Sequence, residues 1–433
     1  MTTEPPQPAD EPSGAGQGAP RQSLGRAGAI MASGSLVSRA VGLVRAALLT
    51  GVAGATGYAA DGFNVANTLP NQFYLLLAGG ALNAILVPQI VRAKMRPNGD
   101  EFVNRIITLT LAVLAVATVT LMLAAPLLVR VYAKFDDPAA LRLTTIFAVI
   151  CLPQLFFYGL FTILGQVLNA NGRFAGFMWA PALANVVAVA GLVWFMQAGY
   201  PSGASPADWT PAMIGILAGT ATLSIAIQAL ALVIPLRRIG FRYRPVWGVR
   251  GHGLGEVSQV AKWTFGSLVV SQLGYVVTSR VLTGATERGK VLGESVSGLA
   301  AYQNAFLIVM LPHGLITVSL VTALYTSLSE AASRDDTRQV RRYHDQGLRL
   351  PAVIIVPGCV FLAVLAPYIT STFFFSNSLD QTRAIAVVLS VIAWMAIPMS
   401  WTYLNDRVFY AHEMTWMSFR LQCVTTGVAT IGA

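Results

Sequence analysis

The chain has 433 residues, of which 55% are hydrophobic and only 11% are charged, and its formal net charge is +10 at pH 7. Soluble domains carry roughly 25% charged residues, so this chain lacks the polar surface that a protein needs to face water on all sides. The composition excludes an ordinary soluble globular protein and indicates a protein surrounded mostly by lipid.

Apolar runs of about 20 residues, the length that crosses a bilayer, recur along the chain. Residues 1–25 are instead rich in Pro, Gly, Gln and Ala, and we expect them to form a disordered cytoplasmic tail. The sequence therefore predicts an all-α polytopic membrane protein. Its expected spans are residues 27–50, 63–91, 106–132, 143–170, 174–198, 211–236, 257–282, 298–328, 351–374 and 384–410, with an eleventh from Met414 to the end.

The placement of basic residues predicts the orientation. If the loops alternate between the two sides, 18 of the 29 Lys and Arg residues share a side with the N-terminus. By the positive-inside rule the N-terminus is then cytoplasmic. We interpret the basic loops as topology signals that contact anionic lipid, with no nucleic-acid partner. The opposite side holds six: Lys134, Arg142, Arg280, Arg288, Lys290 and Arg383.

Short sequence words recur at a nearly constant offset. The Gly-Ser-Leu-Val of 34–37 returns 232 residues later at 266–269, and Leu69-Pro70 returns 242 residues later as Leu311-Pro312. An even number of spans separates the copies, so the halves are expected to run in parallel around a central cavity. We predict two parallel six-helix repeats, an N-terminal lobe over 26–250 and a partial C-terminal lobe over 251–433. Because the second repeat is short of spans, the chain is expected to be C-terminally truncated.

The first span carries two arginines, Arg39 and Arg45. A charge at the centre of a spanning helix costs roughly 2.5 to 3.5 kcal/mol, so each arginine needs a partner or a wet cavity. Ser38, Gly42 and Arg45 lie on one helical stripe with Arg39 beside it, and we expect this stripe to face the cavity. Guanidinium groups bind phosphate oxygens in a bidentate manner, which favours an anion site. An architectural network is the alternative.

Asp61 opens the second span and is the nearest carboxylate in the sequence. It is expected either to pair with one of the arginines when no substrate is bound or to cap its own helix. Catalytic motifs and cofactor signatures are missing, the four histidines stand singly, and the three cysteines lie in apolar runs. We therefore expect neither enzymatic chemistry nor a metal site.

A set of short motifs in this sequence is shared with a known family. They are Ser38-Arg39-Ala40-Val41-Gly42-Leu43-Val44-Arg45, Ala60-Asp61-Gly62-Phe63, Leu69-Pro70-Asn71, Gly80-Ala81, Val87-Pro88, Gln166-Val167-Leu168-Asn169-Ala170 and Gly172-Arg173-Phe174. Through them the sequence resembles the MurJ (MviN) family of lipid II flippases, within the multidrug/oligosaccharidyl-lipid/polysaccharide exporter superfamily. The resemblance implies that Arg39, Arg45 and Asp61, with Ser38 beside them, line a cationic substrate cavity. It also implies fourteen spans in a complete member.

This sequence departs from the family pattern at four positions. Tyr74 and Gly79 stand where an arginine and a glutamate are common, and Leu307 and Met310 replace a second Arg and Glu. The cavity is therefore expected to be less charged than in a typical member, with Arg280 as a candidate for compensation.

The resemblance implies a flippase that carries undecaprenyl-diphosphate-linked peptidoglycan precursor to the outer leaflet of the bacterial plasma membrane by alternating access. The expected partners are this lipid-linked precursor, membrane lipids and cell-wall synthesis proteins. Two alternatives stay open: a related polysaccharide-lipid or multidrug exporter, and a non-transporting scaffold of the cell-wall synthesis machinery.

Overall fold

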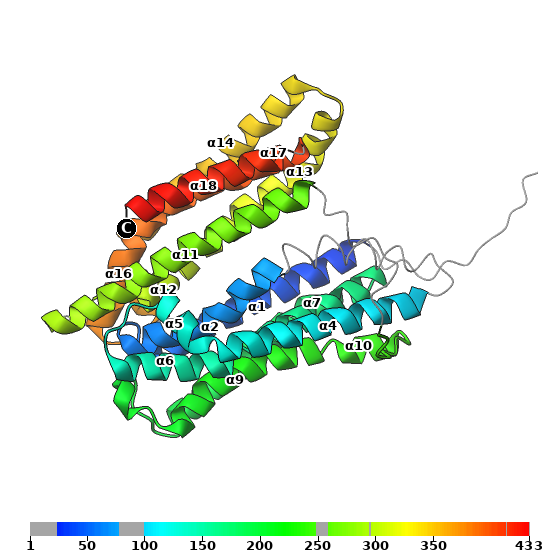
Figure 1. The fold of residues 1–433 in the computed structure, drawn as a ribbon. Helices are drawn as coiled ribbons and strands as arrows, with labels where there is room; N and C mark the ends of the chain where they lie inside the picture. The colour runs from blue at the N-terminus through cyan, green and yellow to red at the C-terminus, as the bar shows by residue number, and fades with distance from the viewer. Residues whose placement is uncertain (1–23, 78–98, 248–258, 294–295, 413, 433) are drawn as a thin grey trace, which may run out of the picture.

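The computed structural model describes residues 24–77, 99–247, 259–293, 296–412 and 414–432, and these residues form two helical bundles (Figure 1). The first bundle contains α1 (Leu24–Ala53), α2 (Tyr58–Leu77), α4 (Gly99–Leu123), α5 (Ala125–Tyr132), α6 (Pro138–Cys151), α7 (Gln154–Ala170), α8 (Ala175–Gln197), α9 (Pro211–Leu230) and α10 (Val233–Arg238).

The second bundle contains α11 (Gln259–Leu292), α12 (Leu299–Pro312), α13 (Val318–Ser333), α14 (Thr337–Val364), α15 (Ala366–Phe373), α16 (Leu379–Ile392), α17 (Ala396–Ala411) and α18 (Thr415–Ile431). Nine helical segments among the described residues are long and apolar enough to cross a membrane. The expectation of an all-α polytopic protein is confirmed.

Two proline positions explain where predicted spans divide. Pro153 has no N–H to donate, and the helix that begins at Pro138 stops at Cys151 before α7 starts at Gln154. Pro312 ends α12 and is followed by a π-helical turn, His313–Thr317, which leads into α13. Such turns insert an extra residue into a helix and are frequent at functional sites.

The internal repeat appears as equivalent packing in the two bundles. α1 packs on α8 and α11 packs on α18. At the first pair, Gly34 lies against Trp179; at the second, Gly266 lies against Phe419. Small residues at these positions let the helix axes approach closely. The prediction of two parallel repeats is confirmed by this shared geometry.

Several predicted boundaries differ from the structure, two of them by ten residues or more. α11 continues to Leu292, ten residues beyond the predicted end, and α14 begins at Thr337, before the predicted start at residue 351. Both extensions are polar stretches of helix that continue beyond an apolar segment. A prediction that counts only apolar runs does not include them. The predicted tail lies outside the described residues except for Leu24 and Gly25, which belong to α1.

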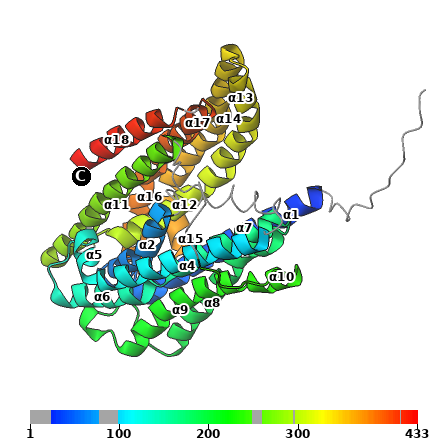
Figure 2. The same cartoon turned by 45° about the vertical axis from the view of Figure 1, so that its right-hand side comes forward.

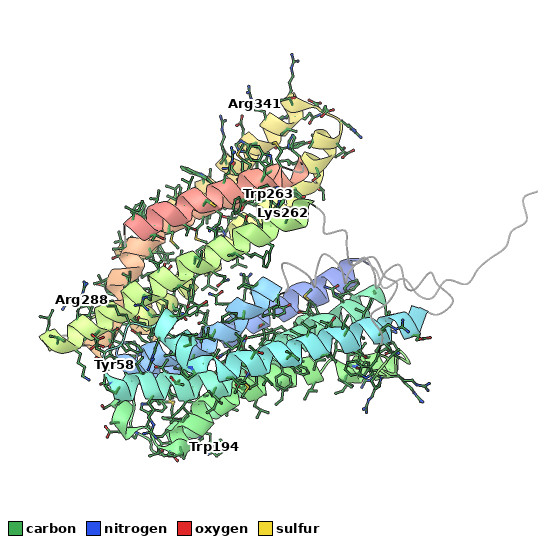
Figure 3. The ribbon with its side chains drawn as sticks, viewed as in Figure 1. Tyr58, Trp194, Lys262, Trp263, Arg288 and Arg341 are labelled. Carbon is green, nitrogen blue, oxygen red and sulfur yellow. The ribbon has the colours of Figure 1, made fainter. Side chains whose placement is uncertain are left out.

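The two bundles meet at one end of the molecule and their ribbons diverge toward the other (Figures 1 and 2). Tyr58 and Arg288 mark the end where the bundles meet, and Lys262 and Arg341 mark the opposite end (Figure 3). We call these the closed end and the open end. Ala47 of α1 and Ala55 in the segment that follows α1 pack in an apolar cluster with the second bundle and join the bundles near the closed end.

Candidate functional site

Arg39 lies on the face of α1 that is turned toward the second bundle. Its side chain is exposed, and its guanidinium approaches Gly314 in the π-helical turn. A methyl group placed on Gly314 would be 2.7 Å from Nη1 of Arg39 and 3.4 Å from its Cζ. Any side chain at this position would contact the guanidinium, so glycine allows Arg39 of the first bundle to lie close to the backbone of the second.

Arg45 lies about two turns further along α1 and is half-buried. Tyr158 on α7 and Cys151 on α6 lie near it. Tyr158 in turn packs against the ring of Tyr74 at a centroid distance of 5.8 Å. The surroundings of Arg45 are therefore polar and aromatic side chains of the first bundle.

Neither arginine has a counter-ion in the part of the chain that the structure describes. The three ion pairs there join Arg105 to Glu101, Lys290 to Asp137 and Arg334 to Glu330. Two permanent positive charges within an apolar helix, without a carboxylate to balance them, favour an incoming anion.

Ser38 is directed elsewhere than expected. The amide of Asn185 on α8 donates to the Ser38 carbonyl oxygen at 2.9 Å and to its Oγ at 3.3 Å. A methyl group on Gly42 would be 3.5 Å from the same amide. The prediction that Ser38 and Gly42 face the region between the lobes is wrong, because this stripe of small residues forms the α1–α8 contact.

Asp61 joins the two bundles. It is fully buried, and its Oδ2 accepts a hydrogen bond from Oγ1 of Thr286 on α11 at 2.5 Å. Its Oδ1 accepts from the backbone N–H of Ala300 at 2.7 Å. This N–H group is in the first turn of α12, where a negative charge is stabilised.

The structure thus brings Asp61 to α11 and α12 and not to Arg39 or Arg45. The expected pairing with an arginine is absent among the described residues, and the capping alternative is half right. Asp61 does cap a helix, but that helix belongs to the second bundle. Gly298 precedes the capped turn, and any side chain there would clash with Asp61 Oδ2 and Thr286 Oγ1.

Further polar contacts continue along α2 between the bundles. Nε2 of Gln272 on α11 donates to Oε1 of Gln72 at 3.1 Å. Nε2 of Gln303 on α12 donates to Oγ1 of Thr68 at 3.4 Å and to the hydroxyl of Tyr275 at 3.1 Å. Hydrogen bonds of this kind can be exchanged for water when the bundles separate, unlike tightly packed apolar contacts.

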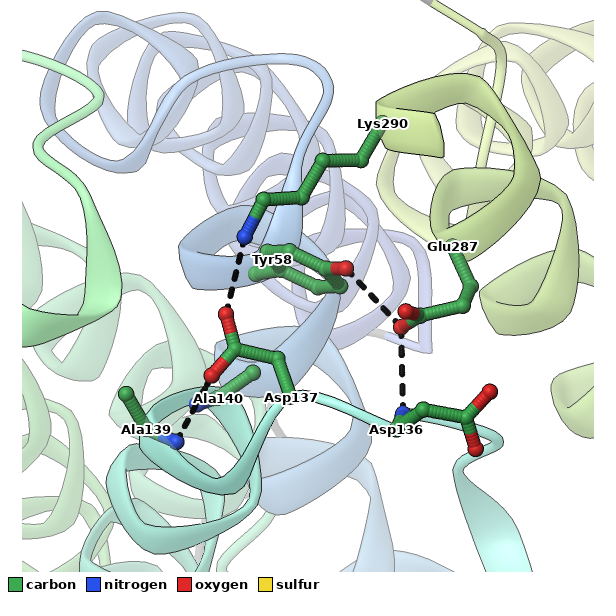
Figure 4. Close-up of polar contacts among 7 residues, drawn as sticks. All are labelled: Tyr58, Asp136, Asp137, Ala139, Ala140, Glu287 and Lys290. Carbon is green, nitrogen blue, oxygen red and sulfur yellow. Dashed lines mark hydrogen bonds and ion pairs between the residues drawn. The ribbon is translucent and has the colours of Figure 1, made fainter. Parts of the chain in front are cut away.

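Two neighbouring sets of polar contacts complete the closed end (Figure 4). Oε2 of Glu287 accepts from the hydroxyl of Tyr58 at 2.9 Å and from the backbone N–H of Asp136 at 3.1 Å. Nζ of Lys290 donates to Oδ2 of Asp137 at 2.8 Å and lies 4.5 Å from the centre of the Tyr58 ring. All of these contacts join α11 to the first bundle.

The second bundle has an intramembrane cation of its own, which the sequence analysis did not single out. The guanidinium of Arg407 on α17 lies over the rings of Tyr403 and Tyr325 and donates to the Tyr403 hydroxyl at 2.8 Å. The Tyr403 ring packs edge-on against His313, next to Gly314. The sequence signal for this contact is an arginine four residues after a tyrosine within an apolar segment.

The structure describes three of the four positions that depart from the family pattern. The Tyr74 hydroxyl is hydrogen-bonded to Thr162 at 2.5 Å, and Leu307 and Met310 are half-buried on α12. Gly79 lies outside the described residues. Within the described ranges, no cluster of His, Cys, Asp and Glu that could hold a metal ion occurs.

The chain matches the family model described as "Lipid II flippase MurJ" over residues 53–433. It is 26% identical over 407 residues to the "Probable lipid II flippase MurJ" of Haemophilus influenzae, covering 88% of this chain and 74% of the relative. It is 27% identical over 369 residues to the "Lipid II flippase MurJ" of Burkholderia cenocepacia, covering 84% and 68%.

Solved structures show the same fold. One of lipid II flippase MurJ in an inward closed conformation has a TM-score of 0.71 at 16% identity, covering 93% of this chain and 80% of that one. An inward-facing multidrug resistance MATE family transporter has a TM-score of 0.59 at 14% identity, covering 92% and 88%. From the family match over most of its length, the chain belongs to the lipid II flippase MurJ family.

Proposed function

We propose that the chain moves lipid II, the undecaprenyl-diphosphate-linked peptidoglycan precursor, from the cytoplasmic to the outer leaflet. The observation that carries this proposal is the pair Arg39 and Arg45 on one spanning helix, with no counter-ion among the described residues. A diphosphate supplies the missing negative charge and enough oxygens for both guanidinium groups. Family membership supports the same substrate.

The basic residues at the open end support the proposed orientation. Lys262 and Arg341 lie there (Figure 3), as the positive-inside rule expects of the cytoplasmic side. The N-terminus is then cytoplasmic and the closed end faces outward, in the plasma membrane. In this arrangement, headgroups enter from the cytoplasmic leaflet while the lipid tail stays in the bilayer.

Transport in this proposal is a rocking motion of two lobes, residues 26–250 and 251–433. Outward opening breaks the contacts of Asp61 with α12 and of Glu287 with Tyr58, and brings the diverged ends together. The roles then divide: Arg39 and Arg45 hold the diphosphate, Asp61 holds the outer side closed, and Ser38 fixes α1 on α8. These polar contacts have alternative partners in water, so the exchange has a modest cost.

The test combines complementation of a flippase-depleted bacterium with an assay of lipid II exposed at the outer leaflet. The double variant Arg39→Ala/Arg45→Ala is expected to abolish both. A matched control, Arg142→Ala/Arg383→Ala, removes two exposed arginines near the closed end and is expected to keep both. Normal outward exposure in the first variant, at normal protein abundance, would show that the arginines do not form the anion site.

A related exporter is the second candidate, because the fold is shared with multidrug transporters. The two candidates differ in ligand charge. Diphosphate-headed lipid is expected to compete for binding to the purified chain, whereas a hydrophobic cation is expected to be excluded by Arg39 and Arg45. Competition by the cation alone would favour the exporter.

A further inference from the structure

A second cationic site lies away from Arg39 and Arg45, between α11 and the segment that follows α5. It is a pocket of about 340 Å³ lined by Lys134, Val277, Arg280, Val281, Gly284 and Arg288. Three of the six lining residues are cations, and they come from two segments about 150 residues apart. The site is therefore produced by the meeting of the two bundles near the closed end.

The concentration of charge is unusual for this side of the protein. The loops opposite to the N-terminus hold only six basic residues by the sequence assignment, and three of those six line this pocket. A fourth, Lys290, is already paired with Asp137. Topology alone disfavours cations here, so their gathering calls for another explanation.

None of the three pocket cations has an acidic partner among the described residues. Glu287, adjacent to Arg288 in the sequence, is bound instead to the Tyr58 hydroxyl and to the backbone N–H of Asp136. Asp137, three residues after Lys134, is bound to Lys290 and to the start of α6. Neither carboxylate therefore forms an ion pair with a pocket cation.

Two of the cations are positioned by the surrounding backbone. Nη1 of Arg280 donates to the carbonyl of Arg130 at 2.6 Å and to that of Val131 at 3.2 Å, at the end of α5. The backbone N–H of Lys134 donates to Oγ1 of Thr283 at 2.9 Å, and a methyl group on Gly284 would be 3.3 Å from Lys134 Cδ. The stem of Lys134 therefore lies along α11.

The pocket also has an apolar part. Val277 and Val281 precede Arg288 by eleven and seven residues on α11, so the pocket extends about 16 Å along the helix at 1.5 Å per residue. Val281 is 41% exposed. The apolar side chains lie toward the middle of the spanning helix and Arg288 toward its end. Acyl chain and headgroup follow one another in this order in a lipid leaflet. A soluble anion would contact the cations but would make no favourable contact with the valines.

We propose that this pocket binds the phosphate headgroup of an anionic phospholipid in the leaflet at the closed end, with Lys134, Arg280 and Arg288 contacting the phosphate and the valines contacting the upper acyl chain. A lipid held there contacts α11 and the segment after α5 together, and it favours the state in which these bundles are close. The proposal concerns binding and stands apart from the identity of the transported substrate.

The test is native mass spectrometry of the purified full-length chain after exchange into mixed micelles of phosphatidylglycerol and phosphatidylcholine. The parent chain is expected to retain phosphatidylglycerol in preference to phosphatidylcholine. The variant Lys134→Gln/Arg288→Gln is expected to lose this preference by about fivefold or more, because each cation near a lipid phosphate contributes on that order. Arg280 is left intact, since its backbone contacts support α5.

Two matched variants control the test. Arg142→Gln/Arg383→Gln removes the same charge near the closed end but outside the pocket and is expected to bind as the parent does. Lys134→Arg/Arg288→Lys keeps both charges and is expected to keep the preference, which separates charge from folding. Equal retention in the Gln variant and the parent overturns the proposal. Displacement of the lipid by a large excess of inorganic phosphate also overturns it, in favour of a soluble anion.

Discussion

The carboxylate of Asp61 in the first bundle caps the helix that begins at Leu299 in the second, with Oδ1 2.7 Å from the backbone nitrogen of Ala300. A capping contact is ordinarily made within one chain segment. Here it connects two bundles that must separate if the closed end is to open. Asp61 therefore couples the stability of α12 to the position of the first bundle.

Replacing Asp61 with Asn is expected to weaken the closed end. The amide keeps one acceptor for Ala300 but loses the charge that favours the α12 terminus, and hydrogen bonds to charged groups contribute about 1.5–3 kcal/mol. The ratio of closed to open molecules should fall on the order of tenfold. Spin labels at positions 142 and 383, one in each bundle near the closed end, measure this as a longer distance distribution.

The matched control is Asp380→Asn, in the first turn of α16 within a single bundle. It removes a carboxylate near a helix start without touching the contact between bundles. An unchanged distance distribution in Asp61→Asn would show that the carboxylate does not hold the bundles together.

The approach of Arg39 to Gly314 gives a second prediction. Gly314→Ala places a methyl group in contact with the guanidinium, which moves away because it is the end of a flexible side chain. We expect the melting temperature to stay near that of the parent, and affinity for a diphosphate-headed lipid to fall on the order of tenfold, consistent with one charged hydrogen-bonding group displaced.

Gly358→Ala on α14 is the control, because no atom lies within 4 Å of a methyl group placed there. It is expected to change neither property. Parent-like lipid affinity in Gly314→Ala would place the lipid headgroup away from Arg39.

Much of the fold follows from the sequence because bilayer thickness fixes the length of an apolar helix. The starts of α8 and α9 lie at or next to the predicted residues, and the repeated words at 34 and 266 mark equivalent helix contacts. The C-terminal end of α11 and the start of α14 were missed. Both are polar helical turns, and a prediction based on apolar runs treats polar turns as loops.

The site was harder to predict because the sequence gives the chemistry of a residue but not its partner. Asp61 has Arg39 and Arg45 as its nearest charges in sequence, yet its hydrogen bonds come from residues more than 220 positions away. Ser38 and Arg45 lie on the same stripe of α1 in the sequence analysis. In the structure Ser38 contacts α8, where Asn185 donates a hydrogen bond to it. Tertiary packing determines which neighbour each face of a helix contacts, and the sequence of one helix does not specify that neighbour.

The ion pair between Asp137 and Lys290 gives a pH prediction. The hydrogen bond from Lys290 holds the pKa of Asp137 below its ordinary value. The pair therefore contributes stability above the unfolded-state pKa of about 3.9, and this contribution is lost as the pH falls through the lower folded-state pKa. Since Lys290 is 56% exposed, the contribution is about 0.2–1 kcal/mol.

Asp137→Asn isolates this effect. Asp137 also caps α6 by accepting from the N–H of Ala139 at 2.8 Å, and asparagine caps equally well, so only the ion pair is lost. The variant is expected to melt slightly below the parent at pH 7. This gap is expected to stay constant between pH 6 and pH 8 and to shrink as the pH falls below the unfolded-state pKa of Asp137. A gap that does not shrink at low pH would assign the effect to the cap.

The close contact of α11 with α18 gives a prediction for stability. A methyl group on Gly266 would be 3.0 Å from Cε2 of Phe419, so Gly266→Leu must push the two helices apart. Overpacking of this kind costs about 1–3 kcal/mol.

The buried thiols of Cys151 and Cys359 report unfolding when they react with a thiol-specific fluorophore. Gly266→Leu is expected to expose them at a lower temperature than in the parent. Gly427→Leu, on α18 but with no neighbour within 4 Å, is expected to match the parent. If the two variants expose their thiols at the same temperature, the close approach at Gly266 does not stabilise the packing of α11 on α18. The same conclusion would then apply to the equivalent contact at Gly34 in the first bundle.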